Sequence, residues 1–289
     1  MSFDDIPPLP KLLLPGAPEH VERVMDWTRK TQGETRNVID CKYGADYWQK
    51  VDLYLSEDKT ASNLPVIIFF HGGAWSNGTK EWMGYMAPTF LDLPAIFVSA
   101  NYRLAPTIRY PEIVEDCIDA IAWVHRNIAQ YGGDPKKLFI SGHSAGGHLA
   151  SLAALDTVRQ RARGIPDGAI RGCLSVSGSY DFRNRNAPPG APERRVYDVV
   201  LSRDEDDTAA SPITYVNSDT VPFFIAWGAQ DLPRLITQAD AMTKSLKAAK
   251  VRVETLEIAN ADHFGAIEVA ADKAHAWSQI ARRWVSGDE

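Results

Sequence analysis

The chain has 289 residues, of which 45% are hydrophobic and 24% charged, and its formal net charge is -6. These values are typical of a soluble globular protein, and the negative charge argues against binding to nucleic acid or anionic membranes. No apolar run approaches the ~18 residues of a membrane span, and the N-terminus lacks the basic start and apolar core of a signal peptide. We therefore expect a soluble, cytoplasmic protein without nucleic-acid or membrane partners, and the sequence is compatible with a homodimer.

Basic residues gather at residues 159–163, 194–195 and 282–283. Acidic neighbours at residues 204–207 offset them, which indicates solvated surface. The three cysteines are widely spaced and form no CxxC or histidine-rich pattern, so neither a disulfide framework nor a metal site is predicted. No organic cofactor is implied either, because the sequence supplies no ligand set for one.

Short apolar runs alternate with helical patterns, which predicts a mostly parallel sheet covered by helices. Residues 51–55 alternate apolar and polar side chains, as an outer, half-exposed strand would. Residues 66–70 form a continuous apolar run, as a central buried strand would. Further strands are expected at residues 95–98, 138–140, 173–176, 223–227 and 251–258, the last of them nearer the edge.

Three stretches have the apolar spacing of amphipathic helices. The first starts at Pro111 with an acidic residue in its first turn and ends before the glycines at residues 132–133. The second carries an apolar stripe over residues 239–249, and the third is a terminal helix over residues 266–285.

Two segments do not fit the alternation of strand and helix patterns along the chain. Residues 1–36 hold a Pro-rich lead and a polar helix, and residues 182–211 hold Arg, Asn, Pro and Gly followed by a charged stretch. Ligand sites in open α/β sheets lie beyond the carboxyl ends of the strands. Both segments are therefore candidates for a lid over such a site.

The most informative motif is GHSAGG at residues 142–147, between a predicted strand and an apolar helical segment. A sharp strand-to-helix turn exposes a serine hydroxyl at the top of the sheet and needs small residues on both sides. The N-terminal amides of the following helix favour a developing negative charge there. We interpret Ser144 as the nucleophile of a Ser–Asp–His triad; a purely structural Gly-rich turn is the alternative.

A serine nucleophile needs a base, and the triad order of this turn type is Ser, then Asp or Glu, then His. Three histidines follow Ser144. His148 lies one turn into the nucleophile helix and is interpreted as a packing or hydrogen-bonding residue, and His275 lies inside the expected terminal helix. His263, in the polar loop between the last strand and the last helix, is the candidate base.

The candidate acid is Asp231, which lies just beyond the strand expected at residues 223–227. Asp181, after the strand at residues 173–176, is the alternative. Asp262 neighbours His263 and is interpreted as a loop-shaping residue.

The run HGGAW at residues 71–75 directly follows the buried strand at residues 66–70. A tetrahedral oxyanion needs preorganised N–H donors, and glycines let the backbone turn its amides inward. The expected donors are the backbone amides of Gly73, Ala74 and Ala145.

The elbow, the HGG loop and the Asp–His spacing resemble the α/β-hydrolase esterases related to hormone-sensitive lipase. The similarity to kynurenine formamidases is stronger, because they carry HGGxW where many lipase-like esterases have a third glycine. Residues 43–54, 176–181 and 262–264 are also similar to that group, and the similarity spans most of residues 38–285. The resemblance implies an α/β-hydrolase fold: one domain with a mostly parallel eight-stranded sheet, flanking helices, and a small lid from residues 1–36 and 182–211.

The resemblance also implies hydrolysis of N-formylkynurenine, an aryl formamide from tryptophan breakdown, to kynurenine and formate. Trp75, Trp82, Tyr85 and Tyr102 follow predicted strands and are candidates for an aromatic substrate pocket; core or lid packing is the alternative. Two other functions stay open: a carboxylesterase or amidase acting on a different small-molecule substrate, and a binding protein without chemistry. Residues 182–211 do not match the family, which leaves the exact substrate open.

Overall fold

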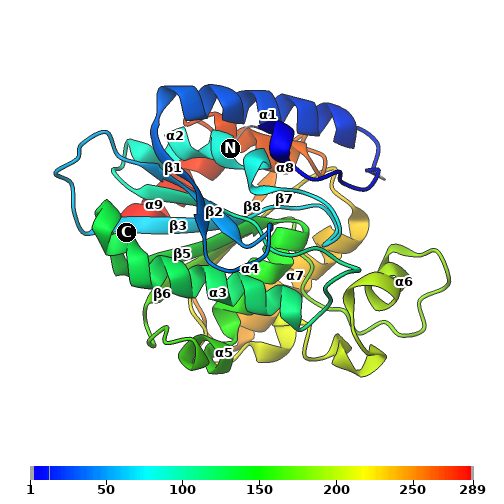
Figure 1. The fold of residues 1–289 in the computed structure, drawn as a ribbon. Coiled ribbons are helices and arrows are strands. Elements are labelled where there is room, and N and C mark those ends of the chain that lie inside the picture. The colour runs from blue at the N-terminus through cyan, green and yellow to red at the C-terminus, as the bar shows by residue number, and fades with distance from the viewer. Residues whose placement is uncertain (1–2, 13, 288–289) are drawn as a thin grey trace.

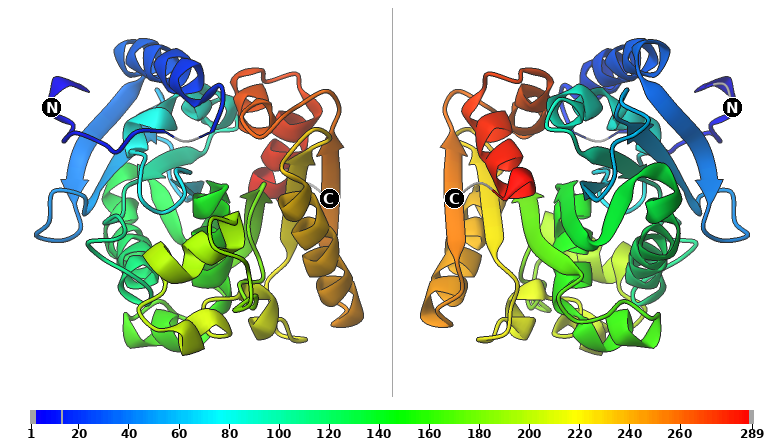
Figure 2. Two further views of the ribbon diagram at one scale, coloured as in Figure 1. Left: turned by 90° about the vertical axis from the view of Figure 1, so that its right-hand side faces the viewer. Right: turned by 90° about the vertical axis from the view of Figure 1, so that its left-hand side faces the viewer.

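The computed structural model describes residues 3–12 and 14–287. One eight-stranded sheet has the order β1-β2-β4-β3-β5-β6-β7-β8 (Figures 1 and 2). β2 runs antiparallel to both of its neighbours, and every other neighbouring pair is parallel. The strands are β1 (Arg36–Lys42), β2 (Lys50–Leu55), β3 (Leu64–Phe70), β4 (Ile96–Ala100), β5 (Gly133–His143), β6 (Ile170–Val176), β7 (Phe223–Gly228) and β8 (Val253–Ile258). The expected eight-stranded, mostly parallel architecture is confirmed.

Helices cover both faces of the sheet. They are α1 (Ala17–Glu34), α2 (Ala87–Leu91), α3 (Glu112–Asn127), α4 (Ala145–Leu155), α5 (Thr157–Ala162), α6 (Pro192–Arg195), α7 (Pro233–Ala248), α8 (Gly265–Glu268) and α9 (Ala276–Ser286). Figure 1 shows α1 and α2 on one side of the sheet and α3 on the other. No helix in the described part of the chain is long and apolar enough to cross a membrane.

The central strand β3 divides the core in two. Val66, Ile68 and Phe70 join one hydrophobic cluster with residues of α3, α4 and α7. Ile67 and Phe69 point to the other face and join a second cluster with residues of α1, α2, α8 and α9. Because successive side chains of a strand point to opposite faces, one continuous apolar run is needed to fill both layers.

The strand β2 differs from its expectation, because all six of its residues are buried. β1 pairs with its outer side, so β2 is no longer at the edge. The polar member of the alternation, Asp52, does not face water: Lys80 Nζ lies 2.9 Å from its carboxylate and 3.1 Å from that of Asp40. A buried carboxylate is retained when a cation and hydrogen bonds compensate its lost hydration.

The expected terminal helix over residues 266–285 is interrupted. α8 and a short 3-10 turn (Val269–Ala271) come first, and α9 begins only at Ala276. Asp272 accepts a hydrogen bond from the Ala274 backbone N–H, a local turn that competes with helix. His275 therefore caps α9, where its Nδ1 accepts from the Trp277 N–H at 3.1 Å, instead of lying within a helix.

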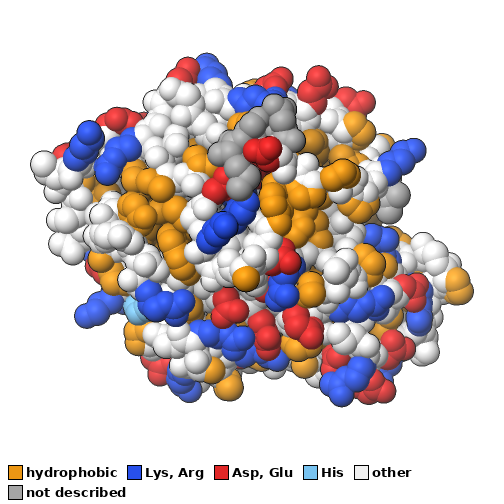
Figure 3. Space-filling model, in the orientation of Figure 1, with side chains coloured by type: hydrophobic (Ala, Val, Ile, Leu, Met, Phe, Trp, Pro, Cys, Tyr) orange, Lys and Arg blue, Asp and Glu red, His pale blue; other side chains and the backbone are white. Residues whose placement is uncertain are grey.

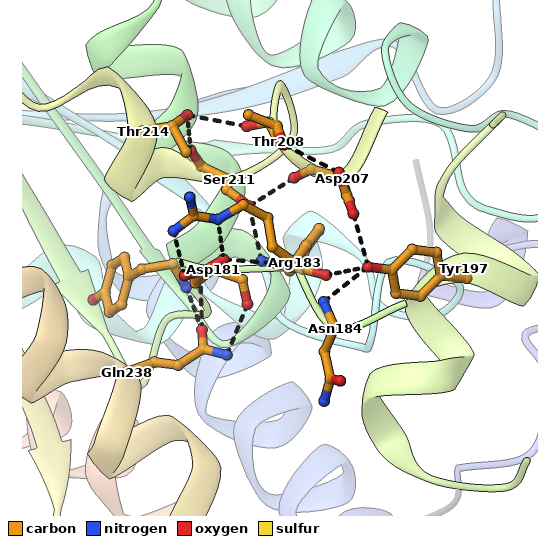
Figure 4. Close-up of polar contacts among 11 residues, drawn as sticks. Asp181, Arg183, Asn184, Tyr197, Asp207, Thr208, Ser211, Thr214 and Gln238 are labelled. Carbon is orange, nitrogen blue, oxygen red and sulfur yellow. Dashed lines mark hydrogen bonds and ion pairs between the residues drawn. The ribbon is translucent and has the colours of Figure 1, made fainter. Parts of the chain in front are cut away.

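A polar network anchors residues 182–211 (Figure 4). The Tyr197 hydroxyl donates to the Phe182 backbone oxygen at 2.7 Å and lies 3.0 Å from the Asp207 carboxylate. The side chain of Arg185 also donates to Asp207, at 2.7 and 2.9 Å. On the α7 side, Gln238 accepts from the backbone N–H of Asp181. The segment is held by these side-chain hydrogen bonds and by apolar residues, such as Val196 and Val200, that join the core.

Candidate active site

Ser144 lies between the end of β5 and the start of α4. Its backbone has φ 55° and ψ -117°, a combination that residues with a side chain rarely adopt. A Cβ atom added at Gly146 would lie 2.0 Å from the backbone oxygen of Phe70, so only glycine fits there. This close approach of α4 to the end of β3 places Ser144 beside the loop that follows β3.

Hydrogen bonds join Ser144, His263 and Asp231. His263 Nε2 lies 2.9 Å from Ser144 Oγ, and His263 Nδ1 lies 2.7 Å from Asp231 Oδ1. An ionised carboxylate can only accept, so we assign the ring proton to Nδ1, which leaves Nε2 to accept from the serine hydroxyl. Such an arrangement of nucleophile, base and acid can activate a serine hydroxyl.

The carboxylate of Asp231 is held in its ionised form. Burial by itself would raise its pKa, but the hydrogen bond and charge of His263, with hydrogen bonds from the Ser177 hydroxyl and the Leu232 N–H, lower the pKa to about 2. At neutral pH the side chain is therefore a fixed negative charge beside the imidazole, and it stabilises the imidazolium that forms when His263 takes a proton.

The alternative acids and bases lie elsewhere. Asp181 pairs with Arg183 at 2.7 Å, and Asp262 accepts from the Gly265 backbone N–H at 2.7 Å, as a loop-shaping residue would. His148 is buried, where its Nδ1 accepts from the Trp75 indole at 3.1 Å.

His143 was not expected from the sequence to take part in the site. Its Nε2 donates to the backbone oxygen of His263 at 2.9 Å, and the two rings lie 4.7 Å apart. Burial, helped by the neighbouring His263, lowers the pKa of His143 well below its ordinary value. A neutral His143 thus holds the loop of the candidate base without competing for its proton.

The HGGAW loop has an unusual backbone. Gly73 has φ 122°, and a Cβ there would lie 2.1 Å from the backbone oxygen of Asn77. Ala74 and Trp75 follow with φ of 51° and 61°. In the described part of the chain, neither Gly73 nor Ala74 donates its N–H to a backbone carbonyl. Ala145 is the first residue of α4, where amides have no partner within the helix, so all three amides remain candidates for an oxyanion hole.

The four candidate pocket aromatics divide into two pairs. Trp75 and Trp82 line a cavity of about 500 Å³ that also contains Ser144 and His263. Tyr85 and Tyr102 are not part of its lining, which corrects the expectation. The Tyr85 hydroxyl donates to the Ile267 backbone oxygen at 2.9 Å.

Tyr102 supports the HGGAW loop from behind. Its hydroxyl donates to the His71 backbone oxygen at 2.9 Å, and its ring stacks on the His71 imidazole at 4.3 Å. Both tyrosines therefore contribute to packing and hydrogen bonding, which is the alternative to a pocket role that the sequence left open.

Both candidate lid segments contribute to this cavity. Leu12, Leu14 and Val21 line it from residues 1–36, of which residues 1, 2 and 13 lie outside the described part of the chain. Residues 190–192 and Arg195 line it from residues 182–211. Both segments therefore supply side chains to the cavity lining, and their role as a lid stays a prediction.

Two cavity arginines were missed by sequence reasoning, Arg195 and Arg234. The sequence places Arg195 among solvated surface arginines, most of which do form ion pairs with acids. These pairs are Arg159 with Asp156, Arg161 with Asp167, Arg163 with Asp119, Arg194 with Asp198 and Arg283 with Glu254. Figure 3 shows such basic and acidic side chains interspersed over the face that carries α3 and α5.

The position of Arg234 could have indicated a functional role, because it lies in the first turn of α7, where cations are disfavoured.

Comparisons with known proteins agree with this architecture. The esterase LipQ of Mycobacterium tuberculosis is 36% identical over 78% of this chain and 54% of its own length. The kynurenine formamidase of Danio rerio is 26% identical over 90% of this chain and 86% of its own length. An esterase structure from Pyrobaculum calidifontis superposes with a TM-score of 0.73 at 23% identity and 93% coverage of both chains, which shows a common α/β-hydrolase fold.

The chain spans about half the length of LipQ and of LipC from the same organism. The BD-FAE family model matches residues 51–246, which include Ser144 and Asp231. Because this match covers more than half of the chain, the protein belongs to the BD-FAE family.

Proposed function

We propose that this protein is a serine hydrolase that cleaves an aryl formamide or a short-acyl carboxylic ester through an acyl-enzyme on Ser144. The observation that carries the proposal is the hydrogen-bonded chain from Asp231 through His263 to Ser144, with contacts of 2.7 and 2.9 Å. It faces a cavity of about 500 Å³, large enough for a small-molecule substrate.

The chemistry follows from these positions. His263 Nε2 takes the hydroxyl proton as Ser144 Oγ attacks the carbonyl carbon, and the negative oxygen that forms is held by the amides of Gly73, Ala74 and Ala145. His263 then gives the proton to the leaving amine or alcohol as the carbonyl carbon–leaving group bond breaks. In the second half, His263 takes a proton from water, the resulting hydroxide attacks the acyl carbon, and Ser144 leaves with the proton.

Two observations favour an aromatic substrate. Trp75 and Trp82 line the cavity beside Ser144, and flat indole rings pack well against an aryl group. The kynurenine formamidase relative matches 90% of this chain, which supports N-formylkynurenine and a place in tryptophan breakdown. The esterase relatives support the second candidate, a carboxylesterase or amidase with a different substrate.

The test compares kcat/KM for N-formylkynurenine with kcat/KM for p-nitrophenyl acetate and butyrate, in the wild type and in Ser144→Ala. A large preference for the formamide that disappears in the variant supports an arylformamidase. Ester turnover with negligible formamide cleavage, again lost in the variant, supports the carboxylesterase. If neither the formamide nor the esters are hydrolysed, the hydrolase proposal is contradicted.

A further inference from the structure

The charged side chains among the described residues that line the cavity around Ser144 are all basic. Its charged lining residues are Lys11, Arg195 and Arg234, and within residues 3–12 and 14–287 it has no aspartate or glutamate in its lining. This is unexpected in a protein with a formal net charge of -6. Neither arginine forms an ion pair with a carboxylate in the described part of the chain, unlike the surface arginines described above.

Arg195 has unused hydrogen-bonding capacity. Its Nη2 donates to the hydroxyl of Ser76, the residue after the HGGAW run, at 2.7 Å. Its Nε is buried and has no hydrogen-bond partner among the described residues. A buried guanidinium N–H without an acceptor is costly, so a shift of this side chain that lets the N–H reach a ligand oxygen in the cavity is favoured.

Arg234 is placed where a cation is unfavourable on its own. It is the second residue of α7, so its charge lies beside the positive end of the helix dipole. Its side-chain hydrogen bond, Nη1–H to the Ser179 hydroxyl, is long at 3.4 Å. Burial lowers its pKa, and the nearby carboxylates of Glu193 and Asp231 only partly oppose that effect. Asp231 is already bonded to His263, and Glu193 does not line the cavity.

We propose that Arg195 and Arg234 bind a carboxylate of the substrate, so that the preferred substrate is an ester or formamide that also bears an acid group. The inference rests on the proposed function, because both arginines line the cavity of Ser144. A guanidinium presents parallel N–H donors that match the two oxygens of a carboxylate. An anion bound in the cavity would accept from the guanidinium groups of Arg195 and Arg234 and would offset the unfavourable position of Arg234.

Matched substrates test the proposal. One pair is 3-acetoxybenzoate and its methyl ester, with the acid on the leaving group. The other is mono-p-nitrophenyl terephthalate and its methyl ester, with the acid on the acyl group. Rigid rings keep each acid away from the scissile ester. The readout is the ratio of kcat/KM for the acid to kcat/KM for its neutral partner, which cancels general losses of activity.

We expect a ratio above one in at least one pair for the wild type, lowered about tenfold or more in Arg195→Gln and in Arg234→Gln through a higher KM for the acid. Arg194→Gln is the matched control, because Arg194 is bonded to Asp198 and does not line the cavity; it should leave the ratio unchanged. If a glutamine variant fails to fold, Arg195→Lys and Arg234→Lys keep the charge, lose the paired donors and should lower the ratio less.

The idea is overturned if the wild type prefers the neutral member of both pairs, or if none of the cavity variants changes the ratio. Turnover of the neutral esters would then still support the hydrolase. If no member of either pair is hydrolysed in a Ser144-dependent manner, the hydrolase proposal and this inference both fail.

Discussion

The cavity around Ser144 has two walls that are built differently. The floor consists of turns at the ends of strands of the sheet, residues 71–75, 142–146, 228–231 and 260–265, of which residues 72–75, 143–144 and 263–264 line the cavity. The cover, formed by residues 10–12, 14–21 and 190–195, comes from the two segments outside the strand–helix alternation. In the floor, backbones approach so closely that a Cβ at Gly146 or Gly73 would collide with main-chain oxygens. In the cover, Gly16 and Gly190 have open space around them.

This difference suggests a division of roles, in which the floor carries out the proposed chemistry and the cover determines which substrate binds. The floor holds the proposed triad and oxyanion donors, whose geometry must be kept within a few tenths of an ångström. The cover supplies apolar side chains and Arg195, which we propose select the bound substrate. Loops of this kind tolerate substitution and insertion better than the strands that they cover. We therefore expect floor variants to change rates or folding, and cover variants to change the choice of substrate.

The largest effect is expected for the nucleophile in the floor. Ser144→Ala should lower kcat on p-nitrophenyl butyrate by a factor on the order of 10⁴ to 10⁶, because no other group replaces the attacking oxygen. Ser218→Ala, at an exposed position far outside the cavity lining, is the control and should keep full activity. Retained activity in Ser144→Ala would refute the assignment of the nucleophile.

A smaller loss is expected for the acid. Asp231→Asn should lower kcat by about 10³- to 10⁴-fold, since the amide cannot hold the Nδ1-protonated imidazole or stabilise its positive charge. Asp181→Asn, at the alternative acid, removes an ion pair with Arg183 and should change kcat less than about threefold. If the two variants exchanged these effects, the acid would be Asp181.

Glycine substitutions should distinguish the closely packed floor from an open helix position outside the cavity. Gly146→Ala should lower the free energy of unfolding by about 3 kcal/mol or more, because its Cβ would meet the Phe70 backbone oxygen at 2.0 Å. Gly33→Ala, within α1 and with no atom near its added Cβ, should raise it by about 0.5–1 kcal/mol through helix propensity. Urea denaturation measures both, and equal effects would contradict the close packing of the floor at Gly146.

The smallest effect concerns pH. The pKa of Asp231 lies at about 2 in the folded protein, below its ordinary value of 3.8. The lowered pKa contributes stability that is present above pH ~4 and is lost as the pH falls toward 2, about 2 kcal/mol in total. The difference in unfolding free energy between wild type and Asp231→Asn should therefore shrink over this range. A difference that stays constant from pH 5 to pH 2 would show that the carboxylate is not stabilised in this way.

The floor could be predicted from the sequence because its residues stand in short motifs with fixed neighbours. GHSAGG, HGGAW and the two turns with Asp231 and His263 follow apolar strands, and the ends of adjacent parallel strands meet at one edge of the sheet. His143 was missed because its role, a hydrogen bond to the His263 backbone, depends on two turns 120 residues apart.

For the cover, the sequence predicts which segments take part but not which side chains line the cavity, because side-chain hydrogen bonds between distant residues place them. Nothing near Arg195 in the sequence separates it from Arg194, yet one faces Ser76 and the other Asp198. The alternation in β2 gave a wrong prediction of exposure for a similar reason. The pattern predicts that Asp52 faces solvent, but Lys80, from the segment after β3, lies beside it in the fold. Tyr85 and Tyr102 likewise carry no local sign that their hydroxyls bond to main-chain oxygens.

The most direct test of the central claim is to label the protein with a fluorophosphonate and locate the adduct by tandem mass spectrometry. The tryptic peptide of residues 138–159 contains Ser141 and Ser151 as well as Ser144, so fragment ions must assign the site. We predict one adduct, on Ser144, and none in Ser144→Ala or in acid-unfolded protein. An adduct on another serine, or ester hydrolysis that survives without any adduct on Ser144, would contradict the account.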